Sequence, residues 1–452
     1  MSSATRPTTK STFRRMLDRA AMPALAMVTA FVLGALVIWI TSGKFETILA
    51  AYGGLVRGAL FKQRGLSESL VATVPYILLS LAVAVGFKSG LFNIGAEGQF
   101  YIGAICAAWV GQAFQGLPAI IYLPLTLGAG ALGGAIWAGI PGYLKARTGA
   151  HEVISTMMMN YVAFRLTEFL VSGPVRDRQA SAVQTPRVAV EAELWTFADI
   201  PNRLHDPLNA LLAALVIAFV AFVIARMLTK AGGPLRKTDS FVTRHSSLVI
   251  AIGAGAIAFV ALPPLTRLWW PFQDQYDRLH VGLLMAIMAA VGVWWLLWKT
   301  TLGFEMRTVG ANPNAAKYAG ISITRNIMLA MAVSGGLAGL AGTAEVLGVS
   351  ICRCLPMFFS SGYGFDSIAI ALLANNNPFG ILAASFLFGA MRNGADLMEL
   401  NSGVSKYIIS VIQALILLFA AAPAVVRWMY RIKAERQVGE EEAVTMRGWG
   451  GG

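Results

Sequence analysis

The residues most able to do chemistry lie between two long apolar runs, in the sequence GFKSGLFNIGAEGQFYIGA at 86–104. Asn93, Glu97 and Gln99 supply hydrogen-bonding groups there, and several glycines accompany them. Glycine and polar residues disfavour an uninterrupted membrane helix, so we expect the backbone to break here. A carboxylate at membrane depth costs about 3 kcal/mol on the translocon scale. A broken helix with these side chains is therefore typical of a polar pathway across a membrane.

A second interrupted stretch follows much later, in GYGFDSIAIALLANNNPFGILAASFLFGA at 362–390. A short apolar piece containing Asp366 stops at three asparagines and Pro378 before apolar character resumes. Two interrupted segments in corresponding places of two halves predict a binding pathway between structural repeats. Asn160, Glu345 and Asp366 are secondary candidates for this pathway, and each has a structural role as its alternative. For Glu97 and Gln99 the alternative is that they cap neighbouring backbone and hold the break open.

The elements that carry these residues must be membrane helices. The chain has 452 residues, of which 56% are hydrophobic and 13% are charged, and its mean hydropathy is +0.64. This composition predicts an all-α polytopic membrane protein of about twelve transmembrane helices, including broken helices. The net charge of +13 would suit nucleic-acid binding in a soluble chain. Here the basic residues cluster between apolar runs, as the positive-inside rule expects, so no nucleic-acid partner is predicted.

The charge pattern also predicts how the chain is divided. Basic residues place the N-terminal tail, 1–20, and the C-terminal tail, 427–452, in the cytoplasm, on either side of a membrane domain at 21–426. The proline-rich segment 173–207 is expected to be an outer loop. The two apolar runs within 208–266 predict one additional transmembrane hairpin.

One polar segment has the sequence signals of a helix and is not expected to be only a loop. In KTTLGFEMRTVGANPNAAKYAGIS at 299–322, Asn312 is placed to cap a helix and Pro313 to occupy its first turn. AAKYAG then continues to a terminating glycine. We expect a short helix on the cytoplasmic face within 303–320.

Several chemistries have no support in the sequence. It contains no GxxxxGK[ST] nucleotide loop and no HExxH motif, so an enzyme with its own ATPase site is not expected. Cys106 is expected to fill core space. Cys352 and Cys354 are compatible with a redox pair or with half of a metal site, and without a second pair neither is strongly indicated.

Four phrases together carry a family resemblance across about 69–426. They are LFNIGAEGQFYIGA at 91–104, HEVISTMMMNYVAF at 151–164, LGFEMRTVGANPNAAKYAGI at 302–321 and GYGFDSIAIALLANNNPFG at 362–380. In this order they resemble the permease subunit of a bacterial ABC importer of the nucleoside and simple-sugar type, related to the ribose and branched-chain amino acid permeases. The resemblance implies a multi-pass protein of the bacterial cytoplasmic membrane.

The resemblance also implies partners and roles. A cytoplasmic ATP-binding subunit or fused tandem ATPase would hydrolyse ATP, an extracytoplasmic binding protein would deliver substrate, and a second permease chain, identical or different, would complete the pore. No cofactor is expected on this chain itself. Asn93, Glu97 and Gln99 match the motif near the substrate path. The residues that match the segment coupled to the ATPase are Glu305, Arg307, Gly310, Asn312, Ala315, Ala316 and Gly320.

The sequence departs from the family pattern in two places, and it leaves three alternative functions open. The hairpin at 208–266 is an addition to the family core, and ANNNP at 374–378 replaces a glycine-bearing turn. NIGAEGQ favours a nucleoside substrate, with a simple sugar or a purine base as the nearest alternative. An ion-coupled secondary transporter would also have broken helices, but it would have no use for the coupling segment. A membrane-embedded enzyme lacks its catalytic constellation.

Overall fold

The computed structural model describes residues 9–114, 116–231, 241–268, 274 and 276–431. Within these ranges the chain forms seventeen α-helices and no β-strand. Six helices are long and apolar enough to cross a membrane, and shorter apolar helices accompany them. The predicted all-α polytopic class, including its broken helices, is confirmed.

Eight of the described helices begin in the first half of the chain and nine in the second. Those of the first half are α1 (Thr9–Ser42), α2 (Phe45–Val56), α3 (Gly65–Lys88), α4 (Ala96–Ala113), α5 (Ala119–Thr148), α6 (Glu152–Ser172), α7 (Ile200–Arg203) and α8 (Pro207–Ala231). Those of the second half are α9 (Phe241–Leu268), α10 (Gly282–Lys299), α11 (Thr301–Ala311), α12 (Pro313–Tyr318), α13 (Ile323–Ala344), α14 (Tyr363–Leu373), α15 (Pro378–Ser402), α16 (Ile408–Ala421) and α17 (Pro423–Met429).

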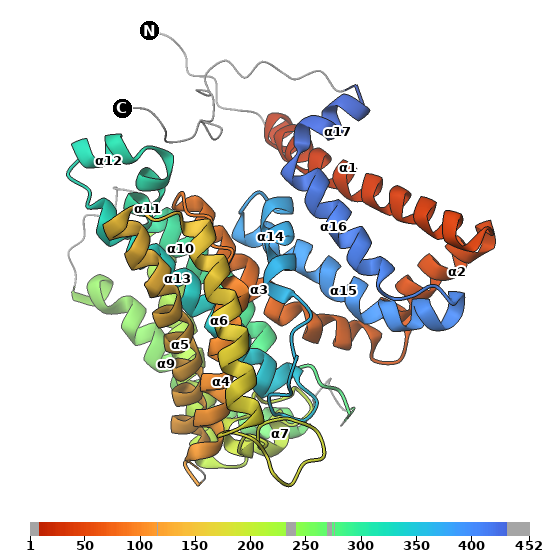
Figure 1. Cartoon of the computed structure of the whole chain (residues 1–452). Helices are drawn as coiled ribbons and strands as arrows, with labels where there is room; N and C mark the ends of the chain where they lie inside the picture. The colour runs from red at the N-terminus through yellow and green to blue at the C-terminus, as the bar shows by residue number, and fades with distance from the viewer. Residues whose placement is uncertain (1–8, 115, 232–240, 269–273, 275, 432–452) are drawn as a thin grey trace.

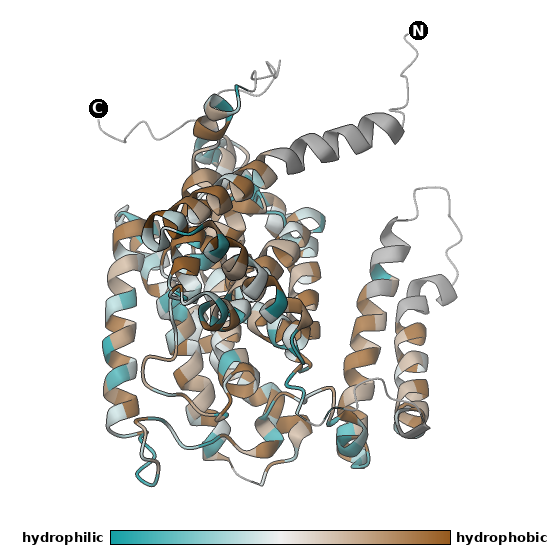
Figure 2. Cartoon of the chain, turned by 90° about the vertical axis from the view of Figure 1, so that its right-hand side faces the viewer, coloured by the Kyte–Doolittle hydropathy of each residue, from teal (hydrophilic) through white to brown (hydrophobic). Residues whose placement is uncertain are grey.

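The helices define two opposite ends of the molecule (Figure 1). α11, α12 and α17 lie at one end, which we call the α12 end, and α7 lies at the other, the α7 end. α13 is central, because it packs against α3, α4 and α5. Its SGGLAGLAG run supplies the small side chains that let membrane helices approach closely. Apolar residues are spread over the sides of the helices (Figure 2), as expected of surfaces that face lipid.

Both predicted interruptions are real breaks in the helices. α3 ends at Lys88 and α4 begins at Ala96, while α14 ends at Leu373 and α15 begins at Pro378. In the second break Asn375 and Asn376 both have positive φ, 51° and 54°. Asparagine tolerates this left-handed conformation better than most residues, so the asparagines do here what a glycine-bearing turn does elsewhere.

Some boundaries differ from those expected. α1 begins at Thr9, within the predicted N-terminal tail, and the final long helix stops at Ala421 because Pro423 starts a separate helix, α17. The predicted hairpin at 208–266 corresponds to α8 and α9, which pack on each other while α8 also contacts α5.

Candidate functional site

The first break is held by amide side chains that bond to one another. Asn93 donates through Nδ2 to Gln99 Oε1 and accepts through Oδ1 from Gln99 Nε2, both at 3.0 Å. Asn93 Oδ1 also accepts from the backbone N–H of Gly95 at 3.0 Å. These are the short-range bonds that satisfy backbone freed by a break.

Two other helices complete this arrangement. Asn160 of α6 accepts from Gly98 N at 2.8 Å and donates to Ile94 O at 3.0 Å. Ser334 of α13 accepts from Asn93 Nδ2 at 2.9 Å and donates to the carbonyl of Ala82 in α3 at 2.7 Å. All four side chains are at most 2% exposed. We call Asn93, Gln99, Asn160 and Ser334 the amide cluster, and each amide oxygen and nitrogen in it has a protein partner.

Glu97, just after the first break, joins the start of α4 to the segment that leads into α14. Its Oε1 accepts from Ser360 Oγ at 2.5 Å and its Oε2 accepts from the backbone N–H of Gly364, in the first turn of α14. A carboxylate is stabilised at such a helix N-terminus by the free N–H groups and the helix dipole. The backbones approach so closely that a Cβ on Gly364 would lie 2.5 Å from Glu97 N. Glu97 therefore holds the start of α4 against the start of α14.

A second polar group surrounds Arg392 of α15. Its Nη1 donates to Tyr76 OH at 3.2 Å, and Tyr76 OH donates to Asp366 Oδ2 at 3.0 Å. Arg392 also donates to Ser361 Oγ, and its Cζ lies 4.0 Å from the centroid of the Tyr363 ring, a cation–π contact.

Glu345 completes the charged group. It lies at the end of α13, 8% exposed, and among the described residues its Oε2 has no hydrogen-bond partner. Arg392 and Arg278 are the charges that act on it. We call Glu97, Glu345, Asp366 and Arg392 the acid–arginine cluster. It holds three carboxylates for one guanidinium, and its edge is open, since Ser361 and Phe365 are exposed and Asp366 and Arg392 only partly buried.

Of the six pathway residues predicted from the sequence, the structure groups three in the amide cluster and three in the acid–arginine cluster. Sequence reasoning missed Arg392 and its partners Tyr76, Ser361 and Tyr363. A signal for Arg392 was present: it is the single basic residue between Arg353 and Lys406, and an isolated charge in an apolar run marks a polar site in a membrane protein.

The segment predicted to face an ATPase forms two short helices at the α12 end. Asn312 ends α11 and caps α12 by accepting from Ala315 N at 3.1 Å, with Pro313 in the first turn. Gly320 follows with φ of 75°. Apart from Ala316, which is buried, residues 311–320 are exposed, and Tyr318 is 94% exposed.

Three contacts attach this segment to the membrane helices. Arg307 Nε donates to Leu297 O of α10 at 2.9 Å, and Glu305 Oε2 accepts from Asn326 Nδ2 of α13 at 3.1 Å. Gly310 touches the chain just after α3: a Cβ on Gly310 would lie 2.6 Å from Gly90 N. Because Gly90 is three residues before Asn93, the segment is in direct backbone contact with the first break.

The cysteines form no metal site in the part of the chain that is described. Cys352 and Cys354 are joined in a disulfide, and no group of three potential metal ligands was found among these residues. Cys106 is a free, partly buried thiol.

Broken helices around a partly buried charged cluster, with an exposed helix pair at one end, are the features of a membrane permease. Comparison with known proteins agrees: a family model described as "branched-chain amino acid transport system / permease component" matches residues 65–238 and 208–421. The chain belongs to this family.

Individual relatives are similar over most of the chain. A guanosine ABC transporter permease, NupP of Bacillus subtilis, is 33% identical over 92% of this chain and 97% of its own length. A nucleoside ABC transporter permease, NupB of Lactococcus lactis, is 30% identical over 90% of this chain and 92% of its own. A glucose permease, TsgB13 of Haloferax volcanii, is 32% identical over 82% and 79%. No solved structure matches the chain.

Proposed function

We propose that this chain is the membrane-spanning subunit of an ATP-driven importer and forms the translocation pathway for nucleosides. The nucleoside assignment rests on the similarity to the guanosine permease, which extends over nearly the whole length of both chains. The protein would lie in the bacterial cytoplasmic membrane with both termini in the cytoplasm, so the α12 end faces the cytoplasm and the α7 end faces outward.

The acid–arginine cluster supplies suitable chemistry for such a substrate. Nucleosides are neutral and carry ribose hydroxyls, base N–H groups and base carbonyls. Asp366 can accept from hydroxyl or amino groups, while Arg392 can donate to a base carbonyl and presents a planar face for stacking. Both are partly buried, and Arg392 donates to exposed Ser361, so they are the groups of the cluster that a solute can reach.

Glu97 has a different role in this proposal. Both of its oxygens bond to the segment 360–364, so in this conformation it closes the contact between the start of α4 and the start of α14. During transport these bonds would exchange with bonds to substrate or water as α4 and α14 separate. The amide cluster would keep the first break folded throughout.

ATP would act from outside the chain. The exposed surface of α12 suits docking into a cytoplasmic ATP-binding subunit or fused tandem ATPase, with Arg307, Asn312 and Ala315 at the junction and Gly310 against the first break. Substrate would arrive from an extracytoplasmic binding protein, a second permease chain would complete the pore, and this chain would bind no cofactor.

A simple sugar is the second candidate, because the glucose permease relative is 32% identical. The sugar would use the same acceptors, since its hydroxyls are donors as ribose hydroxyls are.

The test is ATP-dependent uptake into vesicles that contain this chain, its ATP-binding subunit and its binding protein. We expect uptake of radiolabelled guanosine and uridine that excess ribose or glucose does not compete away. Asp366→Asn should lower uptake at least tenfold. Asp396→Asn is the matched control, because Asp396 is an exposed carboxylate of α15 that forms an ion pair with Lys406. Uptake of sugar alone overturns the nucleoside assignment, and uptake without ATP overturns the importer class.

A further inference from the structure

The disulfide between Cys352 and Cys354 encloses a single residue, Arg353. The pair lies between the end of α13 and the start of α14, at the α7 end of the chain. Arg353 has φ of 51°, a left-handed conformation that costs a residue other than glycine about 1–2 kcal/mol. A covalent ring around one residue removes most of its other conformations, so the bond favours this geometry.

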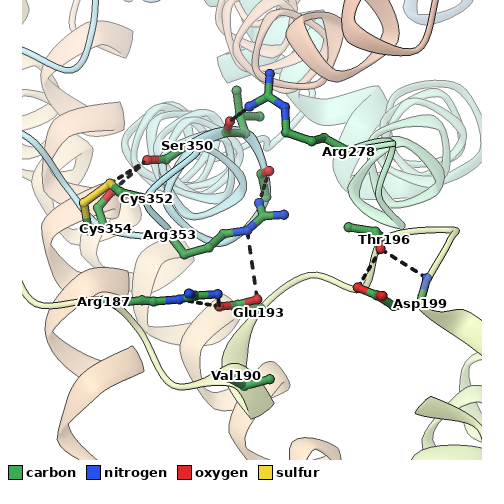
Figure 3. A network of polar contacts seen from close by, with 12 residues as sticks. Arg187, Val190, Glu193, Thr196, Asp199, Arg278, Ser350, Cys352, Arg353 and Cys354 are labelled. Atoms are coloured by element: carbon green, nitrogen blue, oxygen red, sulfur yellow. Dashed lines mark hydrogen bonds and ion pairs between the residues drawn. A yellow bond between two sulfur atoms is a disulfide. The ribbon is translucent and has the colours of Figure 1, made fainter. Parts of the chain in front are cut away.

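The enclosed arginine is a junction between two loops (Figure 3). Its guanidinium donates to Gly348 O and lies 4.0 Å from Glu193 Oε2. Arg187 binds the same carboxylate, with Nη2 donating to Oε1 at 2.8 Å. The backbone carbonyl of Arg353 accepts from Val188 N at 2.9 Å. Arg353 is only 8% exposed, so its contacts are buried between the two loops.

Further backbone bonds fasten the same two loops together. Thr185 N donates to Leu355 O, and Leu355 N donates to Thr185 Oγ1, both at 3.0 Å. Met357 N donates to Val183 O at 3.0 Å. We call 183–194 and 347–357 the loop pair.

The loop pair is directly continuous with the acid–arginine cluster. Three residues after Met357 the chain reaches Ser360, which donates to Glu97, and then Ser361, which accepts from Arg392. The loop pair therefore leads directly into the two serines that contact Glu97 and Arg392.

We propose that Cys352 and Cys354 are a covalent modification site, whose oxidation to a disulfide locks the loop pair and positions Ser360 and Ser361 for transport. In the oxidation two thiols form one S–S bond. A protein disulfide of the thiol oxidoreductase class accepts the two electrons and the two protons and becomes a dithiol. Disulfides persist in oxidising compartments, which agrees with an extracytoplasmic position of the α7 end. The inference rests on the proposed function, because transport is the activity it regulates.

The first test measures the redox state of the two cysteines and the hydrogen exchange of the loop pair, and it does not depend on transport. A Cys106→Ala chain in isolated membranes is denatured and labelled with a maleimide polymer before and after reduction. We expect no labels before and two after. Hydrogen exchange of the peptide 183–194 should rise at least fivefold after dithiothreitol treatment. Two labels without reduction, or unchanged exchange, overturn the proposal.

The second test reads transport with a matched control. Dithiothreitol should lower nucleoside uptake by the Cys106→Ala chain at least fivefold. A chain that also carries Cys352→Ser and Cys354→Ser should start low and should not respond, which excludes an effect of reductant on the partner subunits. Uptake that is insensitive to reduction overturns the regulatory role. Exchange that rises on reduction in a chain without any nucleoside uptake refutes the proposed substrate and retains the lock.

Discussion

The amide cluster lies at the first break, and the acid–arginine cluster lies where the start of α4 meets the start of α14; the two clusters differ in how far their polar groups are satisfied by protein partners. The amide cluster is neutral and at most 2% exposed. Its amide oxygens and nitrogens all hydrogen-bond to other protein groups. The acid–arginine cluster has three carboxylates for one guanidinium, an open edge, and a Glu345 oxygen that no described residue hydrogen-bonds.

The difference separates architecture from transport. A buried amide whose donors and acceptor are all bonded to protein stabilises a break, but it has no free hydrogen-bonding group for a solute. Unbalanced carboxylates are costly at membrane depth and are tolerated where a ligand, water or a counter-charge can reach them. Variants in the first cluster should therefore act on folding, and variants in the second on uptake.

The largest effect is expected from Arg392→Met. The change removes the guanidinium charge that acts on all three carboxylates and the hydrogen bonds to Tyr76 and Ser361, and hydrogen bonds to charged groups are worth about 1.5–3 kcal/mol each. Uptake should fall at least 100-fold, and the thermal unfolding midpoint in detergent should drop. Adding Asp366→Asn should recover part of the stability, because one carboxylate is then neutral. Additive losses in the double variant would show that the two side chains do not share a site.

Asn160→Leu should act on stability alone. It leaves Gly98 N and Ile94 O without partners, at about 1–3 kcal/mol for each buried group. We expect less folded protein and a lower unfolding midpoint, measured by fluorescence-detected chromatography after heating. The ratio of guanosine to uridine uptake per folded molecule should equal that of the unchanged chain. A shifted ratio would place Asn160 in contact with substrate and break the comparison.

Gly310→Ala tests how the first break is connected to ATP. The new Cβ would lie 2.6 Å from Gly90 N, and overpacking of this kind costs about 1–3 kcal/mol. Because the contact is made by backbone atoms, the two segments must separate. We expect substrate-stimulated ATPase activity of the assembled transporter to fall several-fold while basal activity stays.

The control for this variant is Gly292→Ala, whose added Cβ meets nothing within 4 Å. It should leave the ratio of stimulated to basal activity unchanged. Equal ratios for both variants would mean that the Gly90–Gly310 contact does not transmit movement.

The smallest effect is a pH dependence of stability outside both clusters. Burial, reinforced by the charges of Arg353 and Arg278, lowers the pKa of His280 to about 3. The unfolded chain, with a histidine pKa near 6.5, binds the proton more readily, so stability is complete above that pH and declines as pH falls toward 3. The slope for one proton is at most about 1.4 kcal/mol per pH unit.

The measurement is the unfolding midpoint between pH 7.5 and 5. We expect it to fall on acidification, and His280→Gln should remove that part of the slope, because glutamine does not titrate. An identical slope in both chains would assign the dependence to other groups.

The sequence by itself determined the class, both breaks and the capped α12. These are local properties: apolar length, glycine and asparagine at the breaks, and the Asn312–Pro313 start of a helix are written within a few residues. Only the tertiary structure decided which polar residues meet. Glu97 and Gly364 are 267 positions apart, and Tyr76 and Arg392 are 316 positions apart. Such contacts depend on how helices pack around α13, and side-chain type alone does not specify that packing.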